Sequence, residues 1–200
     1  MTDHAERPMP RAKAFDPDEV LQQVMELFWE QGYEATSAQD VVDRTGLNRS
    51  SLYNTFGCKQ DLYLAALDRY CQQGAGMFAR LLREEDAARE AVRRVFERAV
   101  QTAREGDRRG CFVANAAVER ARCDEATRER ASARLAEMRE GFRTLVERGK
   151  VQGEIPKGKD AEALANFLAN TYFGIQTMGQ IGPSCEVLGD VVDTALAALD

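Results

Sequence analysis

The segment TSAQDVVDRTGLNRSSLYNTFGCK, residues 36–59, is the most informative part of the chain. Its apolar spacing predicts a first helix of about two turns that ends at Gly46, because glycine accepts the left-handed conformation of a helix end. Asn48 is a favourable N-cap for a second short helix over residues 49–55. Two short helices joined by so tight a turn have the spacing of a helix-turn-helix, in which the first helix braces the second.

The second of these helices has one face for a core and one for a partner. Leu52 and Phe56 lie four residues apart and are expected to point inward, which leaves an outer face free to enter a DNA major groove. From Arg44 to Lys59 there are three basic residues and no acidic one, whereas residues 1–70 hold 7 basic and 12 acidic residues. A basic surface inside an acidic segment favours a nucleic-acid contact.

The rest of the chain predicts an all-α fold. The sequence has five prolines, and none lies between residues 18 and 155, so helices can run unbroken there. No segment alternates with the period of two that a half-buried strand would show. We expect a long helix from about Lys59 to Arg83 and further helices at about 86–105, 110–121, 124–150, 160–180 and 186–199.

Composition excludes several classes of protein. The chain has 200 residues, of which 44% are hydrophobic and 30% charged, and its apolar stretches are too short or too interrupted to cross a bilayer. The N-terminal residues lack the apolar core of a secretory signal, so the cytoplasm is the expected location. The single histidine is His4, five cysteines form no CxxC pair, and GxSxG and P-loop motifs are absent. We therefore expect no enzyme activity, no metal site and no cofactor.

The run GYEATSAQDVVDRTGLNRSSLYNTFGCKQDLYLAAL, residues 32–67, resembles the DNA-binding domain of the TetR/AcrR transcriptional regulators. Three positions depart from the usual pattern of that family: Cys58 replaces a Ser or Asn, Thr55 a His and Thr45 an Ala. None of these replacements is expected to alter the fold. The residues that carry the resemblance are Gly32-Tyr33, Thr36-Ser37, Val41, Gly46-Leu47, Leu52-Tyr53, Phe56, Lys59 and Leu62.

The resemblance implies that a homodimer binds a near-palindromic operator in double-stranded DNA, with one helix-turn-helix from each subunit. Thr36 and Ser37 would meet phosphate at a helix N-terminus, and Tyr53 and Lys59 would bind backbone phosphates. Arg49 would lie nearest the base edges, where it can bind guanine through two hydrogen bonds. The residues expected beside it at the base edges are Ser50, Ser51 and Asn54.

These predictions divide the chain into a flexible tail over residues 1–15, a helix-turn-helix domain over 16–62 and a ligand-binding and dimerisation domain over 63–200. The last two helices each carry an apolar stripe, which would form a four-helix bundle with a second subunit. The alternative is an ordinary core within one subunit. The stripes are Ala161, Leu164, Ala165, Leu168, Tyr172 and Ile175 on one helix, and Val187, Leu188, Val191, Val192, Ala195 and Leu199 on the other.

The stretch RGCFVANAAVE, residues 109–119, looks like a GC-x-x-x-N-x-x-x-E signature of one branch of the family, where some members respond to electrophiles through the cysteine. Neighbouring arginines and a helix N-terminus would lower the pKa of the Cys111 thiol, unless Cys111 is a small packing residue of the core. Asn115 and Glu119 would either polarise a pocket or satisfy nearby backbone groups. The residues expected to line a ligand pocket are Phe78, Phe96, Cys111, Phe112, Asn115, Phe142 and Phe167.

Together these observations predict a ligand-responsive, DNA-binding transcriptional regulator, most simply a repressor that a small molecule or cysteine modification releases from its operator. One alternative is an activator without a small-molecule inducer. Another is a protein-interaction module that no longer binds DNA. Such a module would be expected to carry acidic residues on the recognition helix, and residues 49–56 contain none.

Overall fold

The computed structural model describes residues 15–84, 87–104 and 108–200, and these ranges contain nine α-helices, one short 3-10 turn and no strand. The all-α fold class is therefore confirmed. The tail proposed for residues 1–15 lies outside the described residues except for Phe15. The elements are α1 (Pro17–Gln31), α2 (Ala38–Thr45), α3 (Arg49–Phe56), α4 (Lys59–Glu84), α5 (Ala88–Arg104), α6 (Phe112–Arg120), α7 (Glu125–Gln152), α8 (Ala161–Met178), η1 (Gly179–Ile181) and α9 (Cys185–Ala197).

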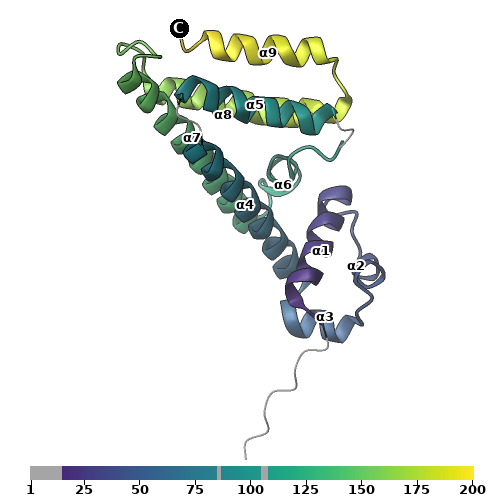
Figure 1. Cartoon of the computed structure of the whole chain (residues 1–200). Coiled ribbons are helices and arrows are strands. Elements are labelled where there is room, and N and C mark those ends of the chain that lie inside the picture. Colours follow the sequence, from purple (N-terminus) through teal and green to yellow (C-terminus); the bar gives the residue numbers. More distant parts are fainter. Residues whose placement is uncertain (1–14, 85–86, 105–107) are drawn as a thin grey trace, which may run out of the picture.

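The helices form two units at opposite ends of a long central helix (Figure 1). Helices α1–α3 pack around the first half of α4, and we call this unit, residues 15–70, the head. Helices α5–α9 make up the body, residues 88–200, in which α7 runs beside α4 and then packs against α5 and α8. Helix α6 lies between the two units. The proposed domain boundary at residues 62–63 falls inside α4.

Local capping explains where the helices of the head begin and end. The Asp16 carboxylate accepts a hydrogen bond from the Asp18 amide, and Pro17 occupies the first position of α1, where its missing N–H costs nothing. Gly46 ends α2 with a φ of 68°, which a residue with a side chain rarely adopts. The chain then turns directly into α3, whose N-cap is Asn48. The short turn fixes how α2 and α3 cross.

Two hydrophobic clusters stabilise the molecule. One fills the body and joins α5, α7, α8 and α9. The other fills the head, and it includes Cys111, Phe112, Val113 and Ala116 from the start of α6. The ring of Phe112 lies edge-on to Tyr63 at 5.7 Å between centroids. By packing, the first half of α6 therefore belongs to the core of the head, although it follows α3 by more than fifty residues in sequence.

The apolar stripe expected to form the dimer is mostly the core of the protomer itself. Ala161, Ala165, Leu168 and Ile175 are buried against the body's own helices. This part of the sequence prediction is wrong because helical periodicity identifies an inward face and does not say which neighbour covers it. The large apolar side chains that α8, η1 and α9 leave exposed are Phe167, Met178, Ile181, Val187 and Val191.

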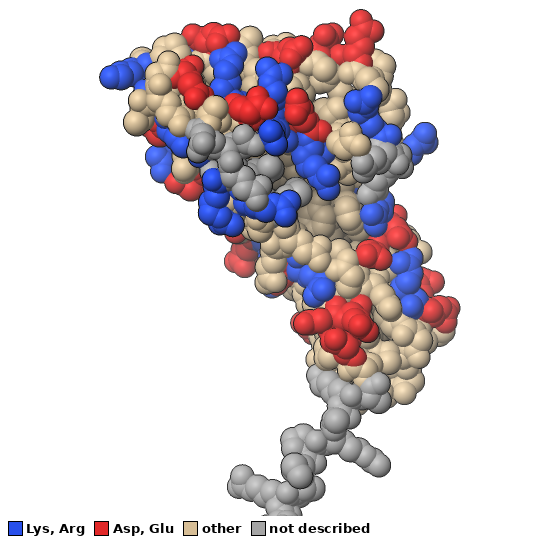
Figure 2. Space-filling model, viewed as in Figure 1, with Lys and Arg blue, Asp and Glu red and all other residues tan. Residues whose placement is uncertain are grey.

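The surface of the body is charged, and the length and apolar character of the helices bear on membrane insertion. On the face seen in Figure 2, Lys and Arg side chains are interspersed with Asp and Glu over the body. Many of them form ion pairs, such as Arg89 with Asp200 and Arg139 with Glu162. Within the described ranges, no helix combines the length and apolar character that crossing a membrane requires.

Candidate functional sites

The outer face of α3 is the first candidate site. Leu52 is fully buried and anchors α3 in the head, as its spacing predicted, while Phe56 is half-buried. Arg49, Ser50 and Asn54 are exposed on the other side. The Asn54 amide donates a hydrogen bond to the Ser50 hydroxyl, 3.3 Å away, one turn earlier on the helix. The exposed face thus presents one guanidinium and a short row of polar groups.

The N-terminus of α2 differs from expectation at one residue. Thr36 is completely buried, and its hydroxyl donates to the Gly32 carbonyl at 2.6 Å, so this side chain is committed to the α1–α2 turn. The Thr36 hydroxyl is therefore engaged within the protein, and the predicted phosphate contact of Thr36 is left to its backbone N–H. Ser37 is exposed and forms a capping box with Asp40, in which each side chain accepts from the other residue's amide. These hydrogen bonds lower the pKa of the Asp40 carboxyl.

The remaining residues expected to contact DNA flank α3. Ser51 and Tyr53 are half-buried on α3, and Lys59 begins α4. The Lys59 ammonium lies 4.2 Å from the centre of the Tyr33 ring, a cation–π contact that holds it beside the α1–α2 turn. Arg44, by contrast, pairs with Glu30 of α1. Arg49 and Lys59 thus account for the basic character of this end of the head.

The last turn of α6 is fixed to the head through Glu119, a contact that sequence patterns did not identify. The two carboxylate oxygens of Glu119 accept hydrogen bonds from the backbone amides of Tyr33 and Glu34, at 3.0 and 2.9 Å. A Cβ at Gly32 would lie 3.1 Å from both of these oxygens, so glycine leaves room for the carboxylate. Glu119 therefore satisfies backbone groups of the α1–α2 turn, one of its two expected roles, and it also borders a cavity.

Arg120 reinforces this contact. Its side chain is largely buried, and its guanidinium lies 3.6 Å from the centre of the Tyr33 ring. It donates to Glu34 and to Gln60 at 2.9 Å each, so one side chain touches both the α1–α2 turn and α4. We call Glu119 and Arg120, together with residues 32–34 and Gln60, the α6 contact.

Asn115 serves the other end of α6. Its amide nitrogen donates to the Arg109 carbonyl at 2.8 Å, and its amide oxygen accepts from Gln180 at 3.1 Å. The Trp29 indole donates to the neighbouring Gly110 carbonyl at 3.1 Å. The Asn115 side chain therefore connects the segment before α6 with η1. In doing so it satisfies a backbone carbonyl, as Glu119 satisfies backbone amides.

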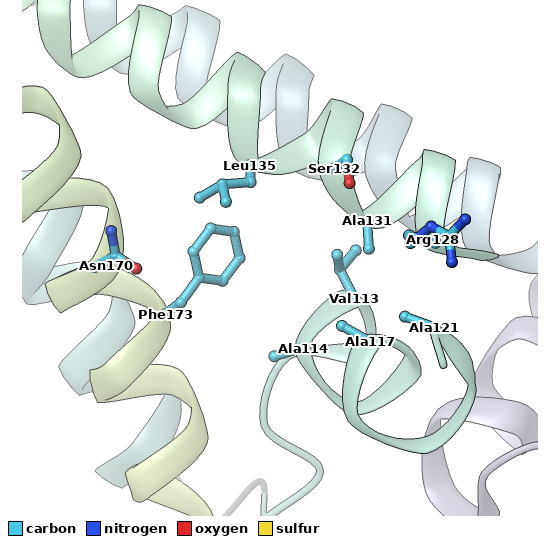
Figure 3. A pocket seen from close by; sticks show the side chains of 10 residues that line it. All are labelled: Val113, Ala114, Ala117, Ala121, Arg128, Ala131, Ser132, Leu135, Asn170 and Phe173. Atoms are coloured by element: carbon cyan, nitrogen blue, oxygen red, sulfur yellow. The ribbon is translucent and has the colours of Figure 1, made fainter. Parts of the chain in front are cut away.

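Three cavities adjoin α6 or the segment that leads into it. The one in Figure 3, about 360 Å³, lies between α6, α7 and α8, and its wall is mainly apolar, with Leu135 and Phe173 approaching each other on one side and Val113 and Ala131 on the other. A second, about 310 Å³, is bordered by α1, α4, α5, α7 and α8, and we call it the Arg134 cavity. A third, about 450 Å³, lies between α1, α6 and η1.

The predicted pocket residues divide between these cavities and the core. Cys111 lines the Arg134 cavity, and Phe112 and Asn115 line the third. Phe96 and Phe142 are instead fully buried and stacked on each other in the core of the body, with ring centres 5.8 Å apart. Phe167 is 43% exposed on the outer face of α8. The side chain of Phe78 lies outside the described residues.

Cys111 is the N-cap residue of α6, and its thiol is buried. Burial raises the pKa of this thiol and outweighs the neighbouring amides, the Tyr70 hydroxyl and the Arg134 charge, each of which lowers it. The expectation of a lowered pKa is therefore wrong. It rested on the adjacent arginines, and the buried thiol agrees instead with the alternative that Cys111 is a packing residue.

Sequence reasoning missed most of the wall of the Arg134 cavity, including Trp29, Tyr70, Arg134 and Tyr172. These residues come from four helices, so no local spacing links them. Arg134 offered a useful signal, because an arginine on the inward side of a helix needs polar partners there.

Comparisons with known proteins support the same assignment for both units. A model of bacterial regulatory proteins of the tetR family matches residues 20–66, and a model of the tetracyclin repressor-like C-terminal domain matches residues 88–190. YezE of Bacillus subtilis (strain 168), an uncharacterized HTH-type transcriptional regulator, is 32% identical over 195 residues, covering 96% of this chain and 100% of YezE. The HTH-type transcriptional repressor ComR of Escherichia coli (strain K12) is 32% identical over 188 residues, covering 93% of this chain and 90% of ComR.

A solved structure agrees with these relatives. A cysteine mutant of the TetR family transcriptional regulator CifR, complexed with 26bp double-strand operator DNA, matches with a TM-score of 0.84 and 33% identity, covering 96% of this chain and 100% of that one. The family and its relatives are transcriptional regulators, not enzymes. Sequence, fold and the helix-turn-helix agree, and the chain belongs to the TetR family of bacterial regulatory proteins.

Proposed function

We propose that this chain is a dimeric transcriptional repressor that binds a near-palindromic operator and leaves it when a ligand binds the body or when Cys111 is modified. The observation that carries the proposal is the exposed face of α3, with Arg49, Ser50 and Asn54 on a helix-turn-helix. The match to CifR bound to operator DNA and the name of ComR as a repressor support it.

In this proposal Arg49 reads a base and the flanking groups hold the backbone. An exposed guanidinium near the start of a recognition helix can reach the O6 and N7 atoms of guanine. Ser50, Ser51 and Asn54 would lie along the same groove. Ser37, Tyr53 and Lys59 would contact phosphates, with Ser37 acting from the N-terminus of α2.

A dimer places two such heads on one operator. We assign the surface that carries the exposed apolar residues Phe167, Val187 and Val191 of α8 and α9 to the second subunit, since large exposed apolar side chains can mark interaction surfaces. Leu168 and Val192, by contrast, are buried within one protomer.

Release from the operator requires a ligand that binds one conformation better than the other. The cavities border α6, and the α6 contact joins that helix to the α1–α2 turn and to Gln60 of α4. A ligand or an adduct that displaces α6 would therefore change the orientation of the head.

Two substitutions test the DNA contacts against an operator selected from random DNA. Arg49→Ala should relax the preference at one base pair and weaken binding by about 1–3 kcal/mol. Lys59→Ala should weaken binding to all sequences and reduce the slope of log affinity against log salt by about one unit. Arg143→Ala in the body, where Arg143 pairs with Glu140, is the control and should change neither quantity.

An unchanged base preference in Arg49→Ala would contradict its base-reading role. The sign of regulation needs a separate measurement, in vitro transcription from a promoter that carries the selected operator. Added protein should reduce the transcript; an increase would identify an activator instead.

A further inference from the structure

The Arg134 cavity has an unusual charge for its size. Twelve residues line it among the described side chains; they include Arg98 and Arg134 and no Asp or Glu. Both arginines act on the Tyr172 hydroxyl, because each lowers its pKa. Burial raises that pKa more strongly. The electrostatic potential of this cavity therefore favours a negatively charged occupant.

Arg134 is a largely buried arginine at the wall of the cavity. Its side chain is 9% exposed, and its Nη1 atom donates to Glu137 at 3.0 Å. Glu137 itself is 56% exposed, so solvent screens this pair. A guanidinium carries five N–H donors, so a second carboxylate can bind beside Glu137.

The backbone of α4 makes room for this arrangement. Gly74 lies under the guanidinium, and a Cβ there would be only 3.0 Å from the Nη2 atom of Arg134. Gly74 also lines the cavity. The glycine therefore lets the guanidinium approach α4 closely.

Aromatic side chains also line the cavity. Trp29 and Tyr70 form one edge-to-face pair with ring centres 5.0 Å apart, and Tyr172 and Phe173 form another at 5.7 Å. Such pairs offer flat faces and edges that suit a further aromatic ring. The Tyr172 hydroxyl accepts a hydrogen bond from Gln176 at 3.2 Å and can donate its own hydrogen to an anion.

We propose that the Arg134 cavity binds an aromatic carboxylate, with the carboxylate on Arg134 and Tyr172 and the ring against Trp29 and Tyr70. The inference rests on the ligand response proposed above and adds the chemical class of the ligand. A carboxylate matches the planar guanidinium through two parallel hydrogen bonds, and a neutral ligand of equal shape does not.

Trp29 is the single tryptophan of the chain and lines this cavity, so its fluorescence reports binding directly. The probes are 4-nitrobenzoate and 4-nitrobenzamide, which share a quenching ring and differ in charge. With the full chain, we expect nitrobenzoate to quench Trp29 with a dissociation constant about tenfold lower than that of nitrobenzamide. Arg134→Gln should raise the constant for nitrobenzoate about tenfold and leave that for nitrobenzamide within about twofold.

Two further variants make the test independent of folding defects in Arg134→Gln. Gly74→Ala adds a methyl group against Nη2 and should also reduce the preference for the anion, while alanine favours the helix. Arg128→Gln, which alters an arginine of the neighbouring cavity in Figure 3, should leave both constants unchanged. Equal affinities for the two probes, no quenching by either, or a preference that survives both Arg134→Gln and Gly74→Ala would overturn the inference.

Operator release is measured separately, by fluorescence anisotropy of labelled operator DNA. Binding of nitrobenzoate with the expected preference but without release supports the anion site and removes it from the proposed regulation. If the protein binds the operator but does not distinguish the two probes, the proposed function as a regulator stands and the anion site is overturned.

Discussion

The head and the body use their buried residues differently. In the head, a cluster of aromatic rings, in which Tyr63 makes edge-to-face contacts with both Phe28 and Phe112, fills the space between α1, α4 and α6. In the body, a solid core of α5, α7, α8 and α9 gives way to cavities where it approaches α6. The adaptable part of the molecule is therefore the boundary between two well-packed units.

The largest expected effect comes from truncating one ring in each core. Phe112→Ala and Phe142→Ala each remove a buried phenyl group and should each lower the free energy of unfolding by about 3–5 kcal/mol. Native-state hydrogen exchange should separate them: Phe112→Ala should expose amides of α1 and early α4, and Phe142→Ala those of α5 and α8. If Phe112→Ala left the head protected, α6 would not belong to its core.

A second effect concerns the outer face of the body. Val191→Arg places a charge on the exposed apolar surface of α9 and should raise the dimer dissociation constant by about a hundredfold or more, because an unpaired charge in an interface costs several kcal/mol. Val151→Arg, at a valine that is 87% exposed on α7, is the matched control and should leave the dimer intact. Sedimentation velocity measures both; a dimeric Val191→Arg protein would move the interface elsewhere.

The α6 contact should give a smaller effect that is visible at specific amides. Glu119→Ala removes the acceptor of the Tyr33 and Glu34 amides and should lower the free energy of unfolding by about 1–2 kcal/mol. These two amides should exchange faster with solvent, and Glu119→Gln, which keeps one carbonyl oxygen, should lie between. Glu129→Ala on the exposed side of α7 is the control. Unchanged exchange at both amides in Glu119→Ala would show that the contact does not join the units.

The smallest effect is a difference in rate. Because burial raises the pKa of the Cys111 thiol, little thiolate is present at pH 7–8, and iodoacetamide should label Cys111 more slowly than the exposed Cys58, Cys123 and Cys185. Labelling should accelerate only above the ordinary thiol pKa. Since the unfolded chain ionises first, the contribution of this thiol to stability is present below the ordinary pKa and is lost as pH rises through the folded value.

Peptide mapping of the alkylated protein by mass spectrometry gives each rate as a function of pH. Cys111→Ser supplies the baseline. Labelling of Cys111 at neutral pH as fast as that of Cys185 would mean that the closed arrangement around α6 opens readily, and it would favour cysteine modification as the route of release.

Prediction from sequence succeeded where the determinants are local. Gly46, Asn48 and Leu52 act within one or two turns of the chain, so the helix-turn-helix follows from their spacing. Spacing does not reveal that the Thr36 hydroxyl binds a carbonyl of the preceding turn.

The body shows the limit of periodicity. The stripe through Leu168 pointed inward as expected, but the neighbour that covers it is the same protomer. Phe96 and Arg134 are both on inward faces, and only packing tells that the first meets another ring and the second meets open space. The cavity depends on residues from separate helices, and such a set has no sequence signature.

The place of α6 in the head's core has a consequence for anyone who would exchange DNA specificities between such regulators. A chimera joined at a single point in α4 would carry the head without Phe112 and Cys111, and would bury Tyr63 against a foreign helix. The transplantable unit is discontinuous: residues 15–70 together with the first turns of α6 and the Glu119–Arg120 pair. A graft that moves both pieces should keep its core, and one that moves only the first should need its missing helix supplied in trans.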